Sequence, residues 1–201
     1  MLTIALPKGR VAEQTLEKFE KVFNEKFVFE DRKLILKKAG FTFLNVRNQD
    51  VPTYVMYGAA DLGVVGLDVL EEKEYDLVKL LDLKIGKCKV AIGLRAGDAI
   101  DWSKSKITVA TKHTAITKRF FESKAMAVDI VKLYGSIELA PLVGLADCIV
   151  DIVETGETMK QNGLEVGETI MESSVFLISN KNSYYNKKTQ ILDLREQLAI
   201  T

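Results

Sequence analysis

The chain has 201 residues, of which 47% are hydrophobic and 28% are charged, a composition typical of a globular protein with a substantial core. Lysine plus arginine and aspartate plus glutamate each number 28, so the net charge is zero and bulk charge does not favour a nucleic-acid surface. The apolar runs are too short to span a membrane and the first is too short for a signal peptide, so we expect a cytoplasmic protein.

Cysteine and histidine are scarce, which limits the metal and redox chemistry of the chain. Cys88 and Cys148 stand far apart without CxxC spacing, so we expect buried thiols and neither a disulfide framework nor a zinc site. His113 is the only histidine, which excludes a multi-histidine metal site, and no protein metal site is predicted. A Ser–His or Cys–His pair built on His113 stays open.

Short apolar runs alternate with stretches of helical periodicity along the whole chain. Besides one or two strands within 168–179, strands are predicted at 2–6, 34–36, 41–46, 62–66, 77–83, 88–94, 107–110, 127–133 and 148–153. Helices are predicted at 12–23, 50–60, 66–72, 114–121, 138–145 and 191–198. This alternation predicts an α/β fold with mainly parallel sheets.

A faint internal repeat suggests that the predicted strands and helices form two similar halves. Residues 58–65, GAADLGVV, resemble residues 144–151, GLADCIVD, and suggest two similar lobes with chain crossings at 84–87 and within 172–175. Ligands of α/β folds bind at the carboxyl ends of strands, so we expect the active site in a cleft between the lobes. The predicted domains are lobe I at 1–85 and 176–201, and lobe II at 86–175.

Residues 147–163, DCIVDIVETGETMKQNG, carry the strongest functional signal. They read as a buried strand, a tight loop and the first turns of a helix that stops at an Asn-Gly pair. Gly156 lets the backbone come close to an anion, and Thr155 and Thr158 offer hydroxyls beside the N–H groups of a helix start. Asp151 can accept hydrogen bonds from two adjacent ribose hydroxyls. These groups predict a site for a sugar phosphate.

A ligand-free interpretation of this loop stays open as well. Thr-Gly turns between a strand and a helix are common, and most of them bind nothing. Glu154 and Glu157 would repel a phosphate unless their side chains point away from it.

The first strand leads into a second loop suited to an anion. Lys8, Gly9 and Arg10 follow it directly before a helix, so two cations lie at the positive end of the helix dipole. This placement is unfavourable without a ligand and therefore favours an anion there, with a solvated loop as the alternative.

Eight segments, taken in order, carry a resemblance to a known family. They are 6–10 (LPKGR), 47–52 (RNQDVP), 61–66 (DLGVVG), 81–83 (LDL), 86–88 (GKC), 110–112 (ATK), 135–141 (GSIELAP) and 144–158 (GLADCIVDIVETGET). Together they span nearly the whole chain and resemble the ATP phosphoribosyltransferase family of histidine biosynthesis. Each segment alone is weak, but their ordered sum is specific.

The resemblance implies a two-lobed fold like that of type II periplasmic binding proteins, and it implies the first step of histidine synthesis. In that reaction N1 of the adenine of ATP attacks C1 of 5-phosphoribosyl 1-pyrophosphate (PRPP), giving N1-(5-phosphoribosyl)-ATP and pyrophosphate. Mg²⁺ is implied as well, carried mainly by the pyrophosphate groups. Adenine N1 has no proton to lose, so bond formation needs no general base.

The resemblance also assigns residues. Arg32 and Arg47 are implied to contact phosphates, and they would be catalytic if they stabilise the leaving pyrophosphate. The alternative is that each arginine forms a surface ion pair, which for Arg32 could arise within the charged segment Glu30–Lys33. On the nucleotide or pyrophosphate side the resemblance implies Lys8, Gly9 and Arg10. Around the ribose 5-phosphate it implies Glu138, Asp151, Thr155, Gly156, Glu157 and Thr158.

Two features depart from related patterns. Asp151 is followed by Ile152, whereas other sugar-phosphate transferases carry two adjacent acids before the Thr-Gly. The chain stops at Thr201, which resembles the short form of the family and implies a homodimer in a hetero-oligomer with a regulatory subunit similar to histidyl-tRNA synthetase.

Two other functions stay open at this point. One is a non-enzymatic two-lobed protein that binds a small anion, and the other is a phosphoribosyltransferase that acts on another base. A nucleotide kinase is not favoured, because the sequence has no GxxxxGK[ST] loop.

Overall fold

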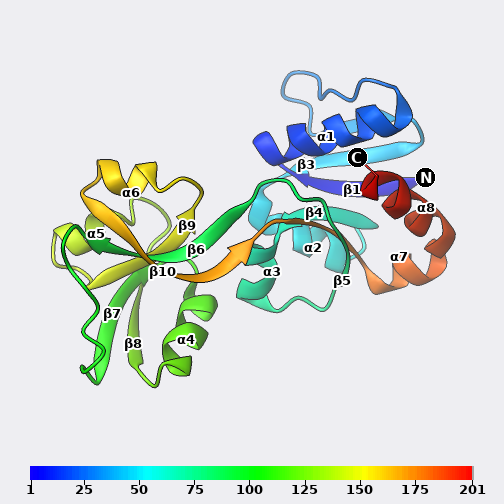
Figure 1. The fold of residues 1–201 in the computed structure, drawn as a ribbon. Helices are drawn as coiled ribbons and strands as arrows, with labels where there is room; N and C mark the ends of the chain where they lie inside the picture. Colours follow the sequence, from blue (N-terminus) through cyan, green and yellow to red (C-terminus); the bar gives the residue numbers. More distant parts are fainter. Residues whose placement is uncertain (201) are drawn as a thin grey trace. The chain divides into compact units, whose positions relative to one another are not determined.

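The computed structural model describes residues 1–200, which divide into two compact units (Figure 1). Unit 1 contains Met1–Gly86 together with the residues from Ser174 onward, and unit 2 contains Lys87–Ser173. Each unit has a sheet of its own with helices packed against it. No helix in the described part of the chain has the length and apolar character needed to cross a membrane.

The sheet of unit 1 consists, in spatial order, of β2 (Ile35–Lys38), β3 (Phe41–Val46), β1 (Leu2–Pro7), β4 (Leu62–Gly66), β11 (Val175–Ser179) and β5 (Val78–Asp82). β1 pairs in parallel with β3 and β4. The other pairings, of β2 with β3 and of β11 with β4 and β5, are antiparallel. The central strands bury side chains on both faces, as their unbroken apolar runs predict.

The helices of unit 1 are α1 (Arg10–Phe23), α2 (Val51–Met56), α3 (Leu67–Lys73), α7 (Lys181–Asn186) and α8 (Lys188–Ala199), with a 3₁₀ turn at Asn48–Asp50. One apolar cluster joins α1 and α8 to the sheet around Phe19, whose ring centroid lies 5.0 Å from that of Phe43. A second cluster joins α2 and α3 to the sheet through Val51, Val55 and Val69. The sheet is therefore covered by apolar side chains on both faces.

The sheet of unit 2 consists, in spatial order, of β10 (Leu164–Ser173), β6 (Cys88–Arg95), β9 (Cys148–Val153), β7 (Lys106–Thr111) and β8 (Ala127–Lys132). Its helices are α4 (Thr114–Ser123), α5 (Leu139–Leu142) and α6 (Glu157–Gln161). Ile116 and Phe121 of α4 belong to one core cluster, and Ala140 of α5 and Met159 of α6 belong to another. Figure 1 accordingly shows α4 on one side of this sheet and α5 and α6 on the other.

Both sheets are mixed, so the prediction of mainly parallel sheets is wrong. The chain leaves unit 1 after β5, at Gly86, and returns to it at Ser174, directly before β11. In unit 2, β6 starts just after Lys87 and β10 ends at Ser173. The strand that enters each unit thus pairs with the strand that leaves it, and such neighbours run antiparallel.

Several helices differ from their predicted extent. α2 and α5 are shorter because the backbone turns left-handed at Gly58 (φ 73°) and Gly144 (φ 74°), a conformation that ends helices. α7 was not predicted, because it has no buried face. Its start is fixed instead by the side chain of Asn180, which accepts hydrogen bonds from the backbone amides of Asn182 and Ser183.

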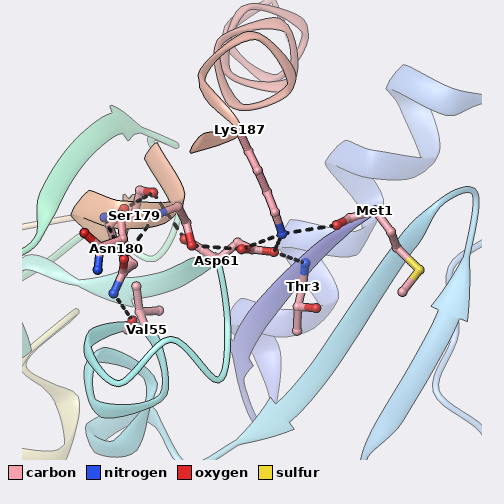
Figure 2. Close-up of polar contacts among 9 residues, drawn as sticks. Met1, Thr3, Val55, Asp61, Ser179, Asn180 and Lys187 are labelled. Atoms are coloured by element: carbon pink, nitrogen blue, oxygen red, sulfur yellow. Dashed lines mark hydrogen bonds and ion pairs between the residues drawn. The ribbon is translucent and has the colours of Figure 1, made fainter. Parts of the chain in front are cut away.

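A largely buried carboxylate joins the beginning of unit 1 to its C-terminal helices, as Figure 2 shows. Asp61 accepts a hydrogen bond from the amide of Thr3 in β1 (2.9 Å) and one from Ser183 Oγ in α7 (2.8 Å). Both carboxylate oxygens also lie 2.8 Å from Lys187 Nζ. That ammonium is 3.5 Å from the backbone oxygen of Met1. One side chain therefore ties β1 to the helices at the other end of the chain.

This contact network shifts the pKa of Asp61. Burial raises the pKa, but hydrogen bonds from Lys187, Thr3 and Ser183 together with the charge of Lys187 outweigh burial, and the pKa lies below the ordinary value for aspartate. A carboxylate whose pKa is lower in the folded than in the unfolded state stabilises the fold at neutral pH. That contribution is lost as the pH falls below about 4 toward the folded-state pKa.

We predict that Asp61→Asn lowers the free energy of unfolding at pH 7 by about 2 kcal/mol, because it removes charge-assisted hydrogen bonds. Urea denaturation between pH 7 and pH 3 measures this loss, which should shrink below pH 4. As a control, Asp129→Asn breaks an exposed ion pair with Lys106 and should change the free energy of unfolding by less than about 0.5 kcal/mol. A loss for Asp61→Asn that is as large at pH 3 as at pH 7 would contradict the role given to its charge.

Candidate active site

The carboxyl end of β9 opens into a cavity of about 320 Å³, within the size range of small-molecule sites. The six residues predicted to hold the sugar phosphate all line it. The full lining is Glu138, Asp151, Ile152, Val153, Glu154, Thr155, Gly156, Glu157, Thr158 and Met159. We call residues 154–158 the β9–α6 loop.

Gly156 gives the β9–α6 loop its shape. Its backbone is left-handed (φ 82°, ψ −1°), and a Cβ atom there would lie 3.1 Å from Val166 Cγ2. Thr155 Oγ1 accepts a hydrogen bond from the amide of Glu157 at 3.4 Å, which folds the loop back on itself. Because α6 has only five residues, an anion here would depend on local N–H groups and hydroxyls rather than on a long helix dipole.

The carboxylates at the cavity differ in their surroundings. Glu154 and Glu157 are exposed, and Glu157 Oε1 accepts a hydrogen bond from Gln161 Nε2 at 3.1 Å within α6. Asp151 is only partly exposed and lies on the same face of β9 as Ile149 and Val153, because side chains alternate along a strand. The carboxylate nearest the sheet is therefore Asp151.

Sequence analysis gave no role to Lys112, whose Nζ lies 3.0 Å from Asp151 Oδ1. Lys112 follows β7, and β7 pairs in parallel with β9, with Thr111 opposite Val150. His113 Nε2 is 3.8 Å from the same Oδ1. Lys112 and His113 lie between a strand and a helix, as the β9–α6 loop does. The same sequence pattern could therefore have identified them as candidate site residues.

A second group of predicted residues lies in unit 1, where β1 and β3 end. Lys8 and Arg47 are neighbours there, since Pro7 pairs with Val46 and the amide of Lys8 donates to the backbone oxygen of Val46 at 2.8 Å. Gly9 has φ 93° and ψ −152°, a conformation almost confined to glycine, and precedes α1 at Arg10. Lys8, Arg10 and Arg47 are exposed cations around this turn.

Arg32 lies at the same end of the sheet of unit 1. It precedes β2, which runs antiparallel to β3, and the backbone oxygen of Leu34 accepts from the amide of Asn45 at 2.8 Å. The backbone of Arg32 is left-handed, with φ 57°, which is uncommon for a residue other than glycine. Within residues 1–200 Glu30 pairs with Lys33, and neither Arg32 nor Arg47 forms an ion pair.

The environment of Cys148 argues against thiol chemistry at this residue. Burial, together with the charge of Asp147, raises the pKa of the Cys148 thiol to about 12. The thiol therefore stays protonated at neutral pH and is a poor nucleophile. Within residues 1–200 neither Cys88 nor Cys148 forms a disulfide bond.

A family model described as HisG: ATP phosphoribosyltransferase matches residues 47–199. The chain belongs to the ATP phosphoribosyltransferase family. It is 65% identical over 199 residues to the ATP phosphoribosyltransferase of Wolinella succinogenes, covering 99% of this chain and 97% of that protein. A chain of the ATP phosphoribosyl transferase (HisG:HisZ) complex from Thermotoga maritima is 35% identical, with a TM-score of 0.85 over 99% of this chain and 97% of that one. The expected family and enzyme class are confirmed: this is a pentosyltransferase of histidine biosynthesis.

The fold has more distant relatives. The substrate-binding protein of an amino acid ABC transporter is 11% identical, with a TM-score of 0.61 over 98% of this chain and 90% of that one. At this identity the likeness concerns the fold alone, and it confirms the expected architecture of the periplasmic-binding-protein type. Membership of the transferase family decides against the non-enzymatic alternative and against another acceptor base.

We predict that Gly156→Ala weakens binding of PRPP by at least about tenfold, because a side chain at φ 82° strains the loop and presses on Val166. The matched control is Gly97→Ala, at the same φ but with no atom within 4 Å of the new Cβ. Both variants should lose about 1 kcal/mol of stability, measured by urea denaturation, since both force alanine into a left-handed backbone. Calorimetric titration with PRPP and Mg²⁺ should show a loss of affinity for Gly156→Ala only, and equal affinities would remove the loop from the site.

Proposed function

We propose that unit 2 holds PRPP and that the chain transfers its phosphoribosyl group to N1 of the adenine of ATP. The observation that carries this proposal is the cavity on the β9–α6 loop, which offers a glycine turn, two threonines and a carboxylate together. In this assignment the 5-phosphate binds the amides and hydroxyls of Thr155–Thr158, and Asp151 accepts from the ribose hydroxyls. Glu138 contacts the same sugar.

The cations of unit 1 are assigned to the phosphates of ATP or to the departing pyrophosphate. Lys8 and Arg10 flank the Gly9 turn, and Arg47 adjoins them across the β1–β3 pair. Guanidinium groups stay charged at any working pH and bind phosphate oxygens in a fork, which suits Arg32 and Arg47 to stabilise charge on the leaving group. Both arginines are exposed and have no carboxylate partner within residues 1–200, so they can bind an anion without breaking an ion pair.

The chemistry needs alignment more than proton transfer. Displacement at C1 builds positive charge on the ribose and negative charge on pyrophosphate, while the lone pair of adenine N1 attacks without losing a proton. A carboxylate such as Asp151 beside the ribose is compatible with the developing positive charge. No general base is assigned, and the buried thiol of Cys148 takes no part.

Mg²⁺ is proposed to arrive on the pyrophosphate of PRPP. Within residues 1–200 no group of three or more histidine, cysteine or carboxylate side chains is arranged to hold a metal ion. Magnesium commonly binds through substrate phosphates with few protein ligands, and here it would offset phosphate charge.

We further propose that the enzyme is a homodimer of the short form that works in the cytoplasm with a HisZ-like regulatory subunit. Support comes from the similarity, over 97% of its length, to a chain of a HisG:HisZ complex. An apolar surface on and after α5 also suits a protein contact. Its exposed side chains are Leu139, Leu142, Val143 and Leu145.

Mass spectrometry of the chain incubated with ATP, PRPP and Mg²⁺ tests the reaction. We expect an adduct with the mass of phosphoribosyl-ATP, formed by the chain alone or once a HisZ-like subunit is added. Free adenine in place of ATP is the control and should give no product. Absence of the adduct under both conditions would overturn the proposal.

We predict that Arg32→Ala and Arg47→Ala each lower kcat about 100-fold, because each removes a donor to the leaving pyrophosphate. The free energy of unfolding should change by less than about 0.5 kcal/mol, since neither side chain is buried. Arg95→Ala is the control, because Arg95 is an exposed arginine of unit 2 that pairs with Asp98. Steady-state kinetics measure the effect, and an unchanged kcat would remove that arginine from the mechanism.

A further inference from the structure

The cavity of unit 2 presents a problem of charge. Four of its lining residues are acidic, namely Glu138, Asp151, Glu154 and Glu157, and none is lysine or arginine. PRPP carries a phosphate and a pyrophosphate, so carboxylates beside it raise the free energy of binding unless a cation offsets them. A cation supplied by the protein must come from outside the lining residues.

Lys112 is placed to supply that charge. Its Nζ lies 3.0 Å from Asp151 Oδ1, and the two side chains are 29% and 17% exposed, so solvent screens this pair less than the surface pairs of the chain. The pair joins β7 to its sheet neighbour β9, and the buried hydrogen bond from Thr111 Oγ1 to the backbone oxygen of Val150 (2.7 Å) fixes the two strand ends together.

The two carboxylate oxygens of Asp151 have different contacts. Oδ1 accepts a hydrogen bond from the amide of Ile152 at 2.8 Å and is the carboxylate oxygen nearest to Lys112 Nζ, at 3.0 Å. In the described part of the chain Oδ2 accepts no hydrogen bond. Oδ2 therefore keeps two acceptor positions, which matches the need of two adjacent ribose hydroxyls.

We propose that Lys112 is a positioning residue for the sugar phosphate: it holds Asp151 through Oδ1, presents Oδ2 to the ribose, and offsets one negative charge beside the anionic substrate. This inference rests on the proposed function, because it assumes that the β9–α6 loop binds PRPP. A purely structural ion pair would stabilise unit 2 without favouring one substrate over the other. The two roles therefore differ in substrate affinity rather than in stability.

Calorimetric titration of the full chain with PRPP and Mg²⁺, and separately with ATP, tests the proposal. Lys112→Met should raise the Kd for PRPP about 10- to 100-fold and leave the Kd for ATP within about twofold. Lys112→Arg keeps the charge and should restore most of the affinity. Lys106→Met is the matched control, since Lys106 begins β7, the strand that Lys112 follows. Lys106 pairs with the exposed Asp129, and its replacement should leave both Kd values unchanged. If Lys112→Met does not fold, Lys112→Gln replaces it with the same expectation.

A double variant shows whether Lys112 acts through Asp151. If it does, Lys112→Met in an Asp151→Asn background should change the Kd for PRPP by no more than about threefold. The proposal is overturned if Lys112→Met binds PRPP as wild type does, or if it weakens ATP equally. If Asp151→Asn and Gly156→Ala still lose PRPP in that case, the proposed function stands without Lys112; if they too bind normally, the proposed function itself fails.

Discussion

The candidate site depends on the pairing of β9 with strands on both of its sides. β9 is antiparallel to β6 and parallel to β7, and its first three residues, Cys148 to Val150, are fully buried. Such a strand has little freedom to shift, because a slip of one residue would turn its apolar side chains to the wrong face. Asp151 is the first polar residue of this run, so its position and that of the β9–α6 loop are fixed by the sheet rather than by the loop.

The internal repeat has a physical basis at the other end of the same strands. Asp61 and Asp147 each precede a buried strand, and each carboxylate accepts from the amide of a residue on the neighbouring parallel strand, Thr3 at 2.9 Å and Thr108 at 2.8 Å. Each aspartate also donates its own amide to the backbone oxygen of that same threonine. The two units thus start a central strand in the same way. They differ in their cation, since Lys187 is 2.8 Å from Asp61 whereas Lys104 is 3.8 Å from the more exposed Asp147.

Local signals in the sequence predicted local structure well. The strands at Phe41–Val46 and Leu62–Gly66 have the predicted bounds. Each is an apolar run whose ends are marked by adjacent charged residues or glycines, so residues close in sequence were enough to locate it. The direction of pairing did not follow from such runs, since it depends on how the chain enters and leaves each unit. α7 had no apolar periodicity to reveal it, and only its Asn180 cap marks its start.

In the candidate site, too, features local in sequence were predictable and contacts between distant segments were not. The β9–α6 loop is contiguous in sequence, so its glycine, threonines and Asp151 could be recognised together as one motif. Lys112 is 39 residues from Asp151, and the pairing of β7 with β9 brings the two side chains together. Arg32 was named through resemblance, and the structure places its left-handed turn at the end of the sheet where β1 and β3 stop. Contacts between strands distant in sequence are set by topology, which a single sequence does not display.

The central claim is that the β9–α6 loop holds the sugar phosphate, and a crystal structure of the chain with PRPP and Mg²⁺ tests it most directly. The account predicts the 5-phosphate against the amides and hydroxyls of Thr155–Thr158, and the ribose hydroxyls on Asp151 Oδ2 with Lys112 still on Oδ1. A phosphate bound elsewhere, with this cavity filled only by water, would contradict it.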